Sequence, residues 1–253
     1  MKRSCKRIKI VWVLLLGKDA RYLVKVEDSD IHTKDGIIRI EDIKNKKFGS
    51  KVRTHLGKEF VIVKPNWIDF FEKAKRLQQV ILPKDFSLIL SKVGIERGWK
   101  VIDIGLGSGW LTIFLAKHIY PGKVYAYEKD ERAIEISKKN FELFGIKNVI
   151  IRKKDATLGL KEKNVDLITI DIQDVKKVIK YAYSSLKEGG WLVIYSPHVN
   201  QVIEVREELK NYKFTQIETV ENLVREWQYT LTLRPKTKGI LHTVFLTFAR
   251  KIE

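Results

Sequence analysis

The chain of 253 residues contains one cysteine, Cys5, and its five histidines are scattered along the sequence. A single cysteine excludes an intrachain disulfide and any zinc site made of several cysteines, and it fits a reducing compartment. The histidines lack the spacing of metal ligands, so we expect no metal site. No run approaches the ~20 apolar residues that a membrane span requires, so we expect no membrane partner.

The N-terminus has some features of a signal peptide, because four basic residues among the first seven precede the apolar run 10–16. However, this run is short, Lys9 stands directly before it, and residues 17–21 make a poor cleavage site. We therefore predict a buried first strand followed by a turn, in a cytoplasmic protein.

Positive charge is in large excess, with a formal net charge of +18. Residues 1–64 hold 17 Lys and Arg against 8 Asp and Glu, so a quarter of the chain carries half of the excess. An excess of this size indicates a polyanionic partner, most simply a nucleic acid. The alternative is a lysine-rich composition that favours thermal stability and solubility.

The most informative segment is 101–109, an apolar stretch that predicts a strand, followed by glycines at alternate positions and then a helical pattern. Glycines allow a close backbone approach to a ligand, and the following helix offers free N–H groups. Dinucleotide sites have the spacing G-x-G-x-x-G, whereas this turn reads G-x-G-x-G after an acid. That acid would repel a pyrophosphate but suits an ammonium group, which favours S-adenosylmethionine (AdoMet). We assign to the donor site Asp103, Gly105, Leu106, Gly107, Ser108 and Gly109. The alternatives are a dinucleotide site and a tight turn without a ligand.

The patterns divide the chain into two domains and a connection. Residues 1–64 combine short alternating segments with frequent glycine turns, which predicts a small, basic, β-rich domain. Residues 65–84 are expected to link the domains, with a helix over 67–77. Over 85–253 strands alternate with helices, and a single strand is predicted at 227–234. Because parallel strands need crossover helices, we predict an α/β, Rossmann-like doubly wound sheet, the class I AdoMet-dependent methyltransferase fold.

Acidic residues follow the predicted strands of this sheet, where ligands of such folds bind. Glu128 ends the second strand and could accept hydrogen bonds from both ribose hydroxyls of the donor, with Lys129 beside it. Asp155, followed by Ala156, comes after the third strand and could accept a hydrogen bond from the adenine amino group. The alternative for each acid is an ordinary residue at the end of a strand.

Asp171 follows the fourth strand and would face the space in front of the donor methyl. There it could bind a substrate amino group and stabilise positive charge that develops on the attacked ring. It is our first choice for the catalytic residue, as well as a donor contact, and Asp174 is the second. The alternative is that one or both acids cap the helix predicted from Val175.

Several short motifs spread over nearly the whole chain point to one family. They are 31–36, 46–49, 63–65, 76–85, 189–197 with Gln201, 225–227, 234–235 and 242–251. With these motifs the chain resembles the tRNA adenine-58 N1-methyltransferases of the single-gene bacterial and archaeal type. The motifs of the C-terminal part are the most specific, since glycine turns occur in many methyltransferases.

The resemblance implies a homotetramer that takes methyl groups from AdoMet and modifies N1 of adenine 58 in the T-loop of tRNA. Archaeal members of the family can also modify the neighbouring position 57. The resemblance makes Asp171 the catalytic acid and makes Glu128 and Asp155 the ribose and adenine ligands. It also implies four residues that line the pocket of the target base: Tyr195, Arg234, His242 and Thr243.

Three parts of the sequence depart from the pattern of the family. Leu106 stands where a small residue or Thr is usual, residues 81–82 replace a common aromatic, and residues 172–175 lack the usual proline and aromatic. The last departure bears on the geometry of the target base more than on donor binding. Two other functions therefore stay open, an AdoMet-dependent methyltransferase of rRNA, protein or a small molecule, and a non-catalytic RNA-binding protein.

Overall fold

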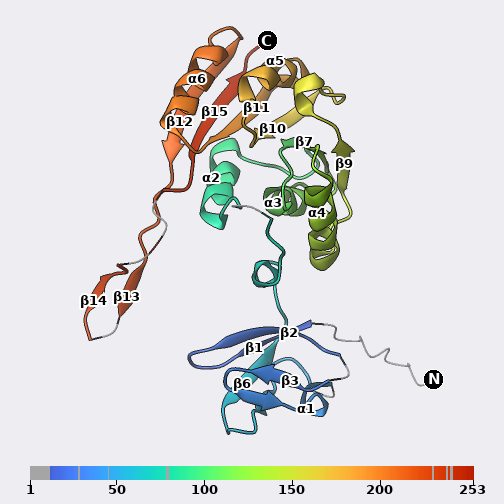
Figure 1. Cartoon of the computed structure of the whole chain (residues 1–253), viewed down its shortest axis with the longest axis vertical. Helices are drawn as coiled ribbons and strands as arrows, with labels where there is room; N and C mark the ends of the chain where they lie inside the picture. Colours follow the sequence, from blue (N-terminus) through green and yellow to red (C-terminus); the bar gives the residue numbers. More distant parts are fainter. Residues whose placement is uncertain are drawn as a thin grey trace, which may run out of the picture. The chain divides into compact units, whose positions relative to one another are not determined.

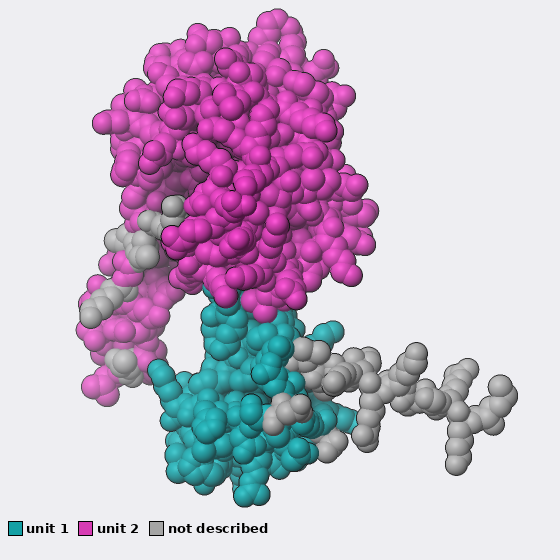
Figure 2. All heavy atoms as spheres, turned by 45° about the vertical axis from the view of Figure 1, so that its right-hand side comes forward, with its two compact units in different colours: residues 1–74 teal, residues 75–253 magenta. Residues whose placement is uncertain are grey.

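A computed structural model describes residues 12–27, 29–44, 46–77, 80–229, 231–237, 239 and 242–253. The chain divides into two compact units, Met1–Ala74 and Lys75–Glu253, which Figure 2 shows in different colours. The structure describes the strand predicted near the N-terminus only from Trp12 onward. Residues 1–11 lie outside the described part. Within that part, no helix is long and apolar enough to cross a membrane.

Unit 1 is built on an antiparallel sheet with the strand order β2-β1-β6-β5, beside the hairpin β3–β4. Alternating apolar residues such as Val13, Leu15, Phe60 and Ile62 are buried and form its core, as the period-two pattern predicts. The elements are β1 (Trp12–Leu16), β2 (Arg21–Lys25), β3 (Ile31–Thr33), β4 (Gly36–Ile38), α1 (Glu41–Lys44), β5 (Lys51–Arg53) and β6 (Glu59–Val63).

The predicted helix over 67–77 is wrong, because only a 3-10 helix, η1 (Asp69–Glu72), forms there. After η1, the backbone N–H groups of residues 75 and 77 do not form helical hydrogen bonds but donate to side chains of unit 2. The N–H of Lys75 donates to Asn140 over 2.8 Å, and the N–H of Leu77 donates to Ser108 over 2.9 Å. Tertiary partners thus replace the helical bonds that the apolar spacing suggested.

Unit 2 contains a seven-stranded sheet with the order β12-β15-β11-β10-β7-β8-β9 (Figure 1). The five strands from β11 to β9 are parallel, whereas β15 runs antiparallel between β11 and β12. The strands are β7 (Lys100–Ile104), β8 (Lys123–Glu128), β9 (Val149–Lys153), β10 (Val165–Ile170), β11 (Leu186–Ser196), β12 (Phe214–Glu221) and β15 (Phe245–Lys251).

Helices connect these strands and cover the sheet, which confirms the predicted class I fold. The helices are α2 (Pro83–Val93), α3 (Trp110–Ile119), α4 (Glu131–Phe144), α5 (Val175–Ser185) and α6 (Val199–Leu209), with the 3-10 helix η2 (Ala156–Leu158). Helices α3 and α4 pack on β7, β8 and β9, whereas α5 and α6 pack on the β10, β11 and β15 side. The strand order reverses between β7 and β10, and ligands of doubly wound sheets bind at that point.

The predicted single strand over 227–234 is also wrong, because this segment folds back into a hairpin. Strands β13 (Trp227–Tyr229) and β14 (Leu233–Pro235) pair with each other and are not part of the large sheet. The polar–apolar alternation continues through the turn without Gly, Asn or Pro, so the sequence carries no signal for the reversal.

Candidate active site

The glycine turn after β7 lies against the end of β10. Gly105 has φ +90°, and a Cβ there would lie 2.1 Å from the carbonyl oxygen of Asp171. On the other side, the N–H of Asp171 donates to the carbonyl of Ile104 over 2.8 Å. Only glycine fits this approach, which fixes the predicted catalytic acid directly beside the predicted donor turn.

Asn140 of α4 fixes the other side of the turn, a role that sequence reasoning missed. Its side-chain oxygen accepts the N–H of Lys75, and its amino group donates to the carbonyls of Lys75 and Ser108. The Ser108 hydroxyl accepts the N–H of Leu77. A lone Asn in a helical pattern gives no signal for this role, because its partners lie on other elements.

Asp103 is buried directly below the turn. Thr112 of α3 donates a hydrogen bond to one of its carboxylate oxygens, and Thr169 of β10 donates to the other over 2.6 Å. Burial raises the pKa of Asp103 to about 6, the two threonine bonds oppose that rise, and the charge of Glu128 adds to it. The sequence did not reveal the two threonines as partners, although Thr169 is a polar residue inside an apolar strand.

Glu128 stands at the end of β8, as predicted, and already bonds to the turn. One of its oxygens accepts the N–H groups of Lys129 and Asp130, and the other accepts the N–H of Gly107 over 3.0 Å. A carboxylate has about four acceptor positions, so this side chain retains capacity for a hydroxyl of a ligand. These bonds hold its orientation toward the turn.

Asp155 caps η2, which begins at Ala156. It accepts bonds from the hydroxyl and the N–H of Thr157, and Lys129 lies 3.2 Å away. The two threonine bonds and then the lysine lower the pKa of Asp155 to about 2, so it is ionised at neutral pH. The structure thus brings Lys129 and Asp155 together at the ends of neighbouring strands.

Asp171 is exposed to solvent as a residue. Its carboxylate group, however, is largely surrounded by protein atoms. This desolvation raises the pKa of Asp171 to about 6, and the charge of Asp103 adds a smaller contribution. Tyr195 of β11 is buried, and among the described residues its hydroxyl has no hydrogen-bond partner. Burial raises the pKa of Tyr195 far above its usual range, and the charges of Asp171, Asp103 and Asp85 add to this, so its hydroxyl is protonated.

The other predicted residues lie in three places. His242 bonds to Glu221 and to the carbonyl of Pro197, which raises the pKa of His242. Thr243 follows it, and Arg234 lies exposed on β14, apart from the large sheet. Asp174 occupies the N-cap position of α5, but its side chain makes no capping bond there.

The chemistry of the site favours a cationic ligand. Asp103 lies one residue before the end of β7, Glu128 ends β8, and Asp171 follows β10; the three strands are adjacent, and the charges of the acids influence one another. Such a group disfavours a pyrophosphate but suits the sulfonium and ammonium groups of AdoMet. Within the described part of the chain, no three His, Cys, Asp or Glu side chains are placed to hold a metal ion. Strand order, glycine turn and acids together define a class I methyltransferase.

Comparisons with known proteins identify the family. Residues 73–234 match the family described as tRNA methyltransferase complex GCD14 subunit, and the chain belongs to this family. It is 32% identical to the tRNA (adenine(57)-N(1)/adenine(58)-N(1))-methyltransferase TrmI of Methanocaldococcus jannaschii, over 94% of both chains.

Two solved structures resemble the whole chain. The tRNA (m1A58) methyltransferase TrmI of Aquifex aeolicus is 26% identical with a TM-score of 0.83, over 97% of this chain and 98% of that one. A SAM-dependent O-methyltransferase of Thermotoga maritima is 34% identical with a TM-score of 0.89, over 97% and 94%. The likeness therefore includes the small N-terminal β domain as well as the methyltransferase fold.

Proposed function

We propose that this protein transfers a methyl group from AdoMet to N1 of adenine 58 in the T-loop of tRNA. The observation that carries the proposal is the position of Asp171. Asp171 is an exposed residue, its backbone touches the glycine turn at Gly105, and its charge acts on the buried hydroxyl of Tyr195. An acceptor base next to the donor turn would meet this carboxylate.

The proposed donor site uses the turn and the two strand-end acids. Gly105, Gly107 and Gly109 permit a close approach of the backbone, Glu128 holds the ribose, and Asp155 holds the adenine amino group. AdoMet supplies an electrophilic methyl group on a sulfonium when it is bound. The carboxylates nearby complement that positive charge, whereas they would weaken the binding of a dinucleotide.

Adenine N1 carries an in-plane lone pair, so no residue has to remove a proton from it. The protein has to place N1 in line with the methyl group, and such orientation can supply roughly 7–11 kcal/mol in favourable systems. The methylated ring is cationic, and Asp171 would stabilise that charge while accepting a hydrogen bond from the exocyclic amine. N1 lies on the pairing edge, so the base must be extruded, at a cost of a few kcal/mol. The residue proposed to contact the extruded ring is Tyr195, which is only 1% exposed.

The tRNA would be held by the basic residues of 1–64. Exposed cations of unit 1 include Lys18, Lys34, Arg39, Lys47, Lys58 and Lys64. Contacts of this kind to phosphates make binding fall steeply with salt concentration. Because tRNA is the substrate, we place the reaction in the cytoplasm.

The proposed homotetramer has support in the C-terminal hairpin. Its apolar side chains are exposed: Trp227, Tyr229, Leu231 and Leu233 have 56%, 80%, 97% and 64% of their surface accessible. Exposed apolar groups on a hairpin that is not part of the large sheet indicate contact with another chain. We propose that further copies of this chain cover them.

Substitution of Asp171 tests the proposal. Asp171→Ala should abolish methyl transfer to tRNA while AdoMet still binds, as measured by calorimetry. Asp174→Ala tests the second candidate for the catalytic acid, and we expect it to keep its activity, because Asp174 is an exposed acid that pairs with Lys177 at 3.2 Å. Full activity of Asp171→Ala would refute the assignment.

The likeness to the Thermotoga maritima structure motivates a second candidate, methylation of an oxygen nucleophile. A hydroxyl group must lose its proton on attack, and Asp171 with a pKa of about 6 could accept it. The two candidates differ in the labelled product. The first gives N1-methyladenosine in tRNA, whereas the second gives a methyl ether.

A further inference from the structure

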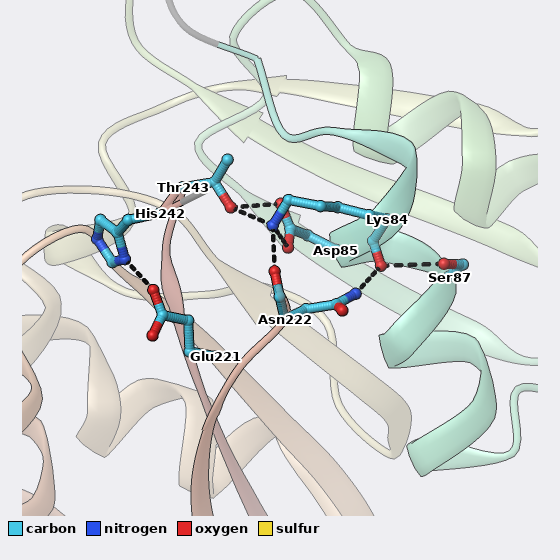
Figure 3. A network of polar contacts seen from close by, with 7 residues as sticks. All are labelled: Lys84, Asp85, Ser87, Glu221, Asn222, His242 and Thr243. Carbon is cyan, nitrogen blue, oxygen red and sulfur yellow. Dashed lines mark hydrogen bonds and ion pairs between the residues drawn. The ribbon is translucent and has the colours of Figure 1, made fainter. Parts of the chain in front are cut away.

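A partly buried polar network joins the start of α2 to the segments next to β12 and β15 (Figure 3). The ammonium of Lys84 donates to Asp85 over 2.8 Å, to the carbonyl of Asn222 over 2.6 Å and to the hydroxyl of Thr243 over 2.7 Å. Thr243 in turn donates to the second oxygen of Asp85 over 2.8 Å, and the Asn222 side chain donates to the carbonyl of Lys84. All three ammonium protons therefore have acceptors.

The network holds both ends of the segment that connects β12 to β15. Asn222 directly follows β12, Thr243 lies two residues before β15, and the hairpin β13–β14 comes between them in sequence. Next to these two residues, His242 bonds to Glu221 and to the carbonyl of Pro197. Pro197 lies two residues beyond Tyr195, so these contacts lead from Lys84 to the predicted target-base pocket.

We propose that Lys84 and Asp85 are positioning residues of the methyl transfer. They hold Thr243 and Asn222, and through them His242, at the correct place beside Tyr195 and Asp171. This inference rests on the proposed function and deepens it. In this view Thr243 acts through the network, because its hydroxyl already donates to Asp85 and accepts from Lys84.

Burial and charge support a geometric role for the pair. The side chains of Lys84 and Asp85 are only 13% and 1% exposed. A buried ion pair adds little net stability, because desolvation offsets the attraction between the charges. We therefore infer that this pair fixes the single arrangement in which every donor and acceptor of the network has a partner. The charge of Asp85 also acts on the hydroxyl of Tyr195, which shows that the network is close to the site.

The test compares Lys84→Met and Thr243→Val with the conservative Thr243→Ser. We expect the first two to lower kcat/KM for tRNA by ~10–100-fold, as for misplaced reacting groups, with an unchanged affinity for AdoMet. Thr243→Ser keeps the hydroxyl and should restore most of the activity. The double variant Lys84→Met/Thr243→Val should be no worse than its worse single member, because both remove one network.

Lys92→Met is the matched control, since Lys92 also lies on α2 and pairs with Glu218 on the surface at 2.6 Å. It should keep full activity. Thr243→Val removes no charge, so it keeps the test usable if Lys84→Met does not fold. A folded Lys84→Met with wild-type kcat/KM would overturn the proposal, and so would a Thr243→Ser variant as inactive as Thr243→Val.

Hydrogen exchange separates a failure of this inference from a failure of the proposed function. We expect Lys84→Met to accelerate exchange at the amides of Asn222 and Thr243 and to leave the amides of β7 unchanged. If the wild-type protein transfers no methyl group to tRNA, the proposed function fails, and the exchange still tests the network. Unchanged exchange at both residues would overturn the inference.

Discussion

Replacement of Gly105 by alanine probes the contact between the glycine turn and the catalytic acid. The added Cβ would lie 2.1 Å from the carbonyl oxygen of Asp171, whereas real Cβ atoms essentially never come closer than 3.0 Å. The backbone must therefore move by about 1 Å, a displacement of reacting groups that can cost ~10²-fold in rate. The positive φ adds about 1–2 kcal/mol of strain. We expect kcat/KM to fall by at least ~10²-fold and the melting temperature to drop.

Gly98→Ala is the control for the backbone strain alone. Gly98 has φ +88°, nearly the same as Gly105, but no atom lies within 4 Å of its added Cβ. This variant should show a comparable strain cost and keep its activity. Initial rates with labelled AdoMet and tRNA, with thermal unfolding of both variants, measure the difference. If Gly105→Ala stays within a few-fold of Gly98→Ala in kcat/KM, the contact is not essential.

Three further predictions follow from the site. Since Asp171 has a pKa of about 6 and acts as a carboxylate, kcat/KM should fall as the pH drops through 6, and Asp171→Asn should be slow at every pH; an unchanged profile in the variant would contradict this. Asn140→Ala leaves the N–H of Lys75 and the carbonyl of Ser108 without their partner, so the free energy of unfolding measured with denaturant should fall by about 2–3 kcal/mol. KM for AdoMet should also rise. The control Lys139→Ala should show neither effect. Glu128→Gln should weaken AdoMet binding by ~10–100-fold in calorimetry, and unchanged affinity would exclude the ribose role.

The parallel half of the fold could be predicted because its signals are local. The strands 100–104 and 165–170 and the helix 131–144 follow the alternation predicted over 85–253, since apolar runs and helical spacing mark them without help from distant residues. The hairpin β13–β14 and the short η1 were missed. The conformation of the hairpin depends on where the chain reverses, and the short η1 depends on which distant groups accept the N–H groups that follow it. The periodicity of apolar residues in the sequence indicates neither of these.

The same division holds for the site. The acids near the strand ends and the glycine turn could be predicted, because each is recognised by its position relative to its own strand. Asn140 contacts a residue 65 positions away, and Lys84 contacts one 159 positions away. Partners at such distances follow from packing of the finished fold, and a single sequence carries no trace of them.

The most direct test of the proposed function is methyl transfer to an unmodified tRNA transcript, with labelled AdoMet and mapping of the modified nucleoside. A transcript with guanine at position 58 serves as the control. We predict N1-methyladenosine at position 58, with or without position 57, and a loss of the position-58 product in the control. AdoMet binding without any label in tRNA, or label confined to sites outside the T-loop, would contradict the account.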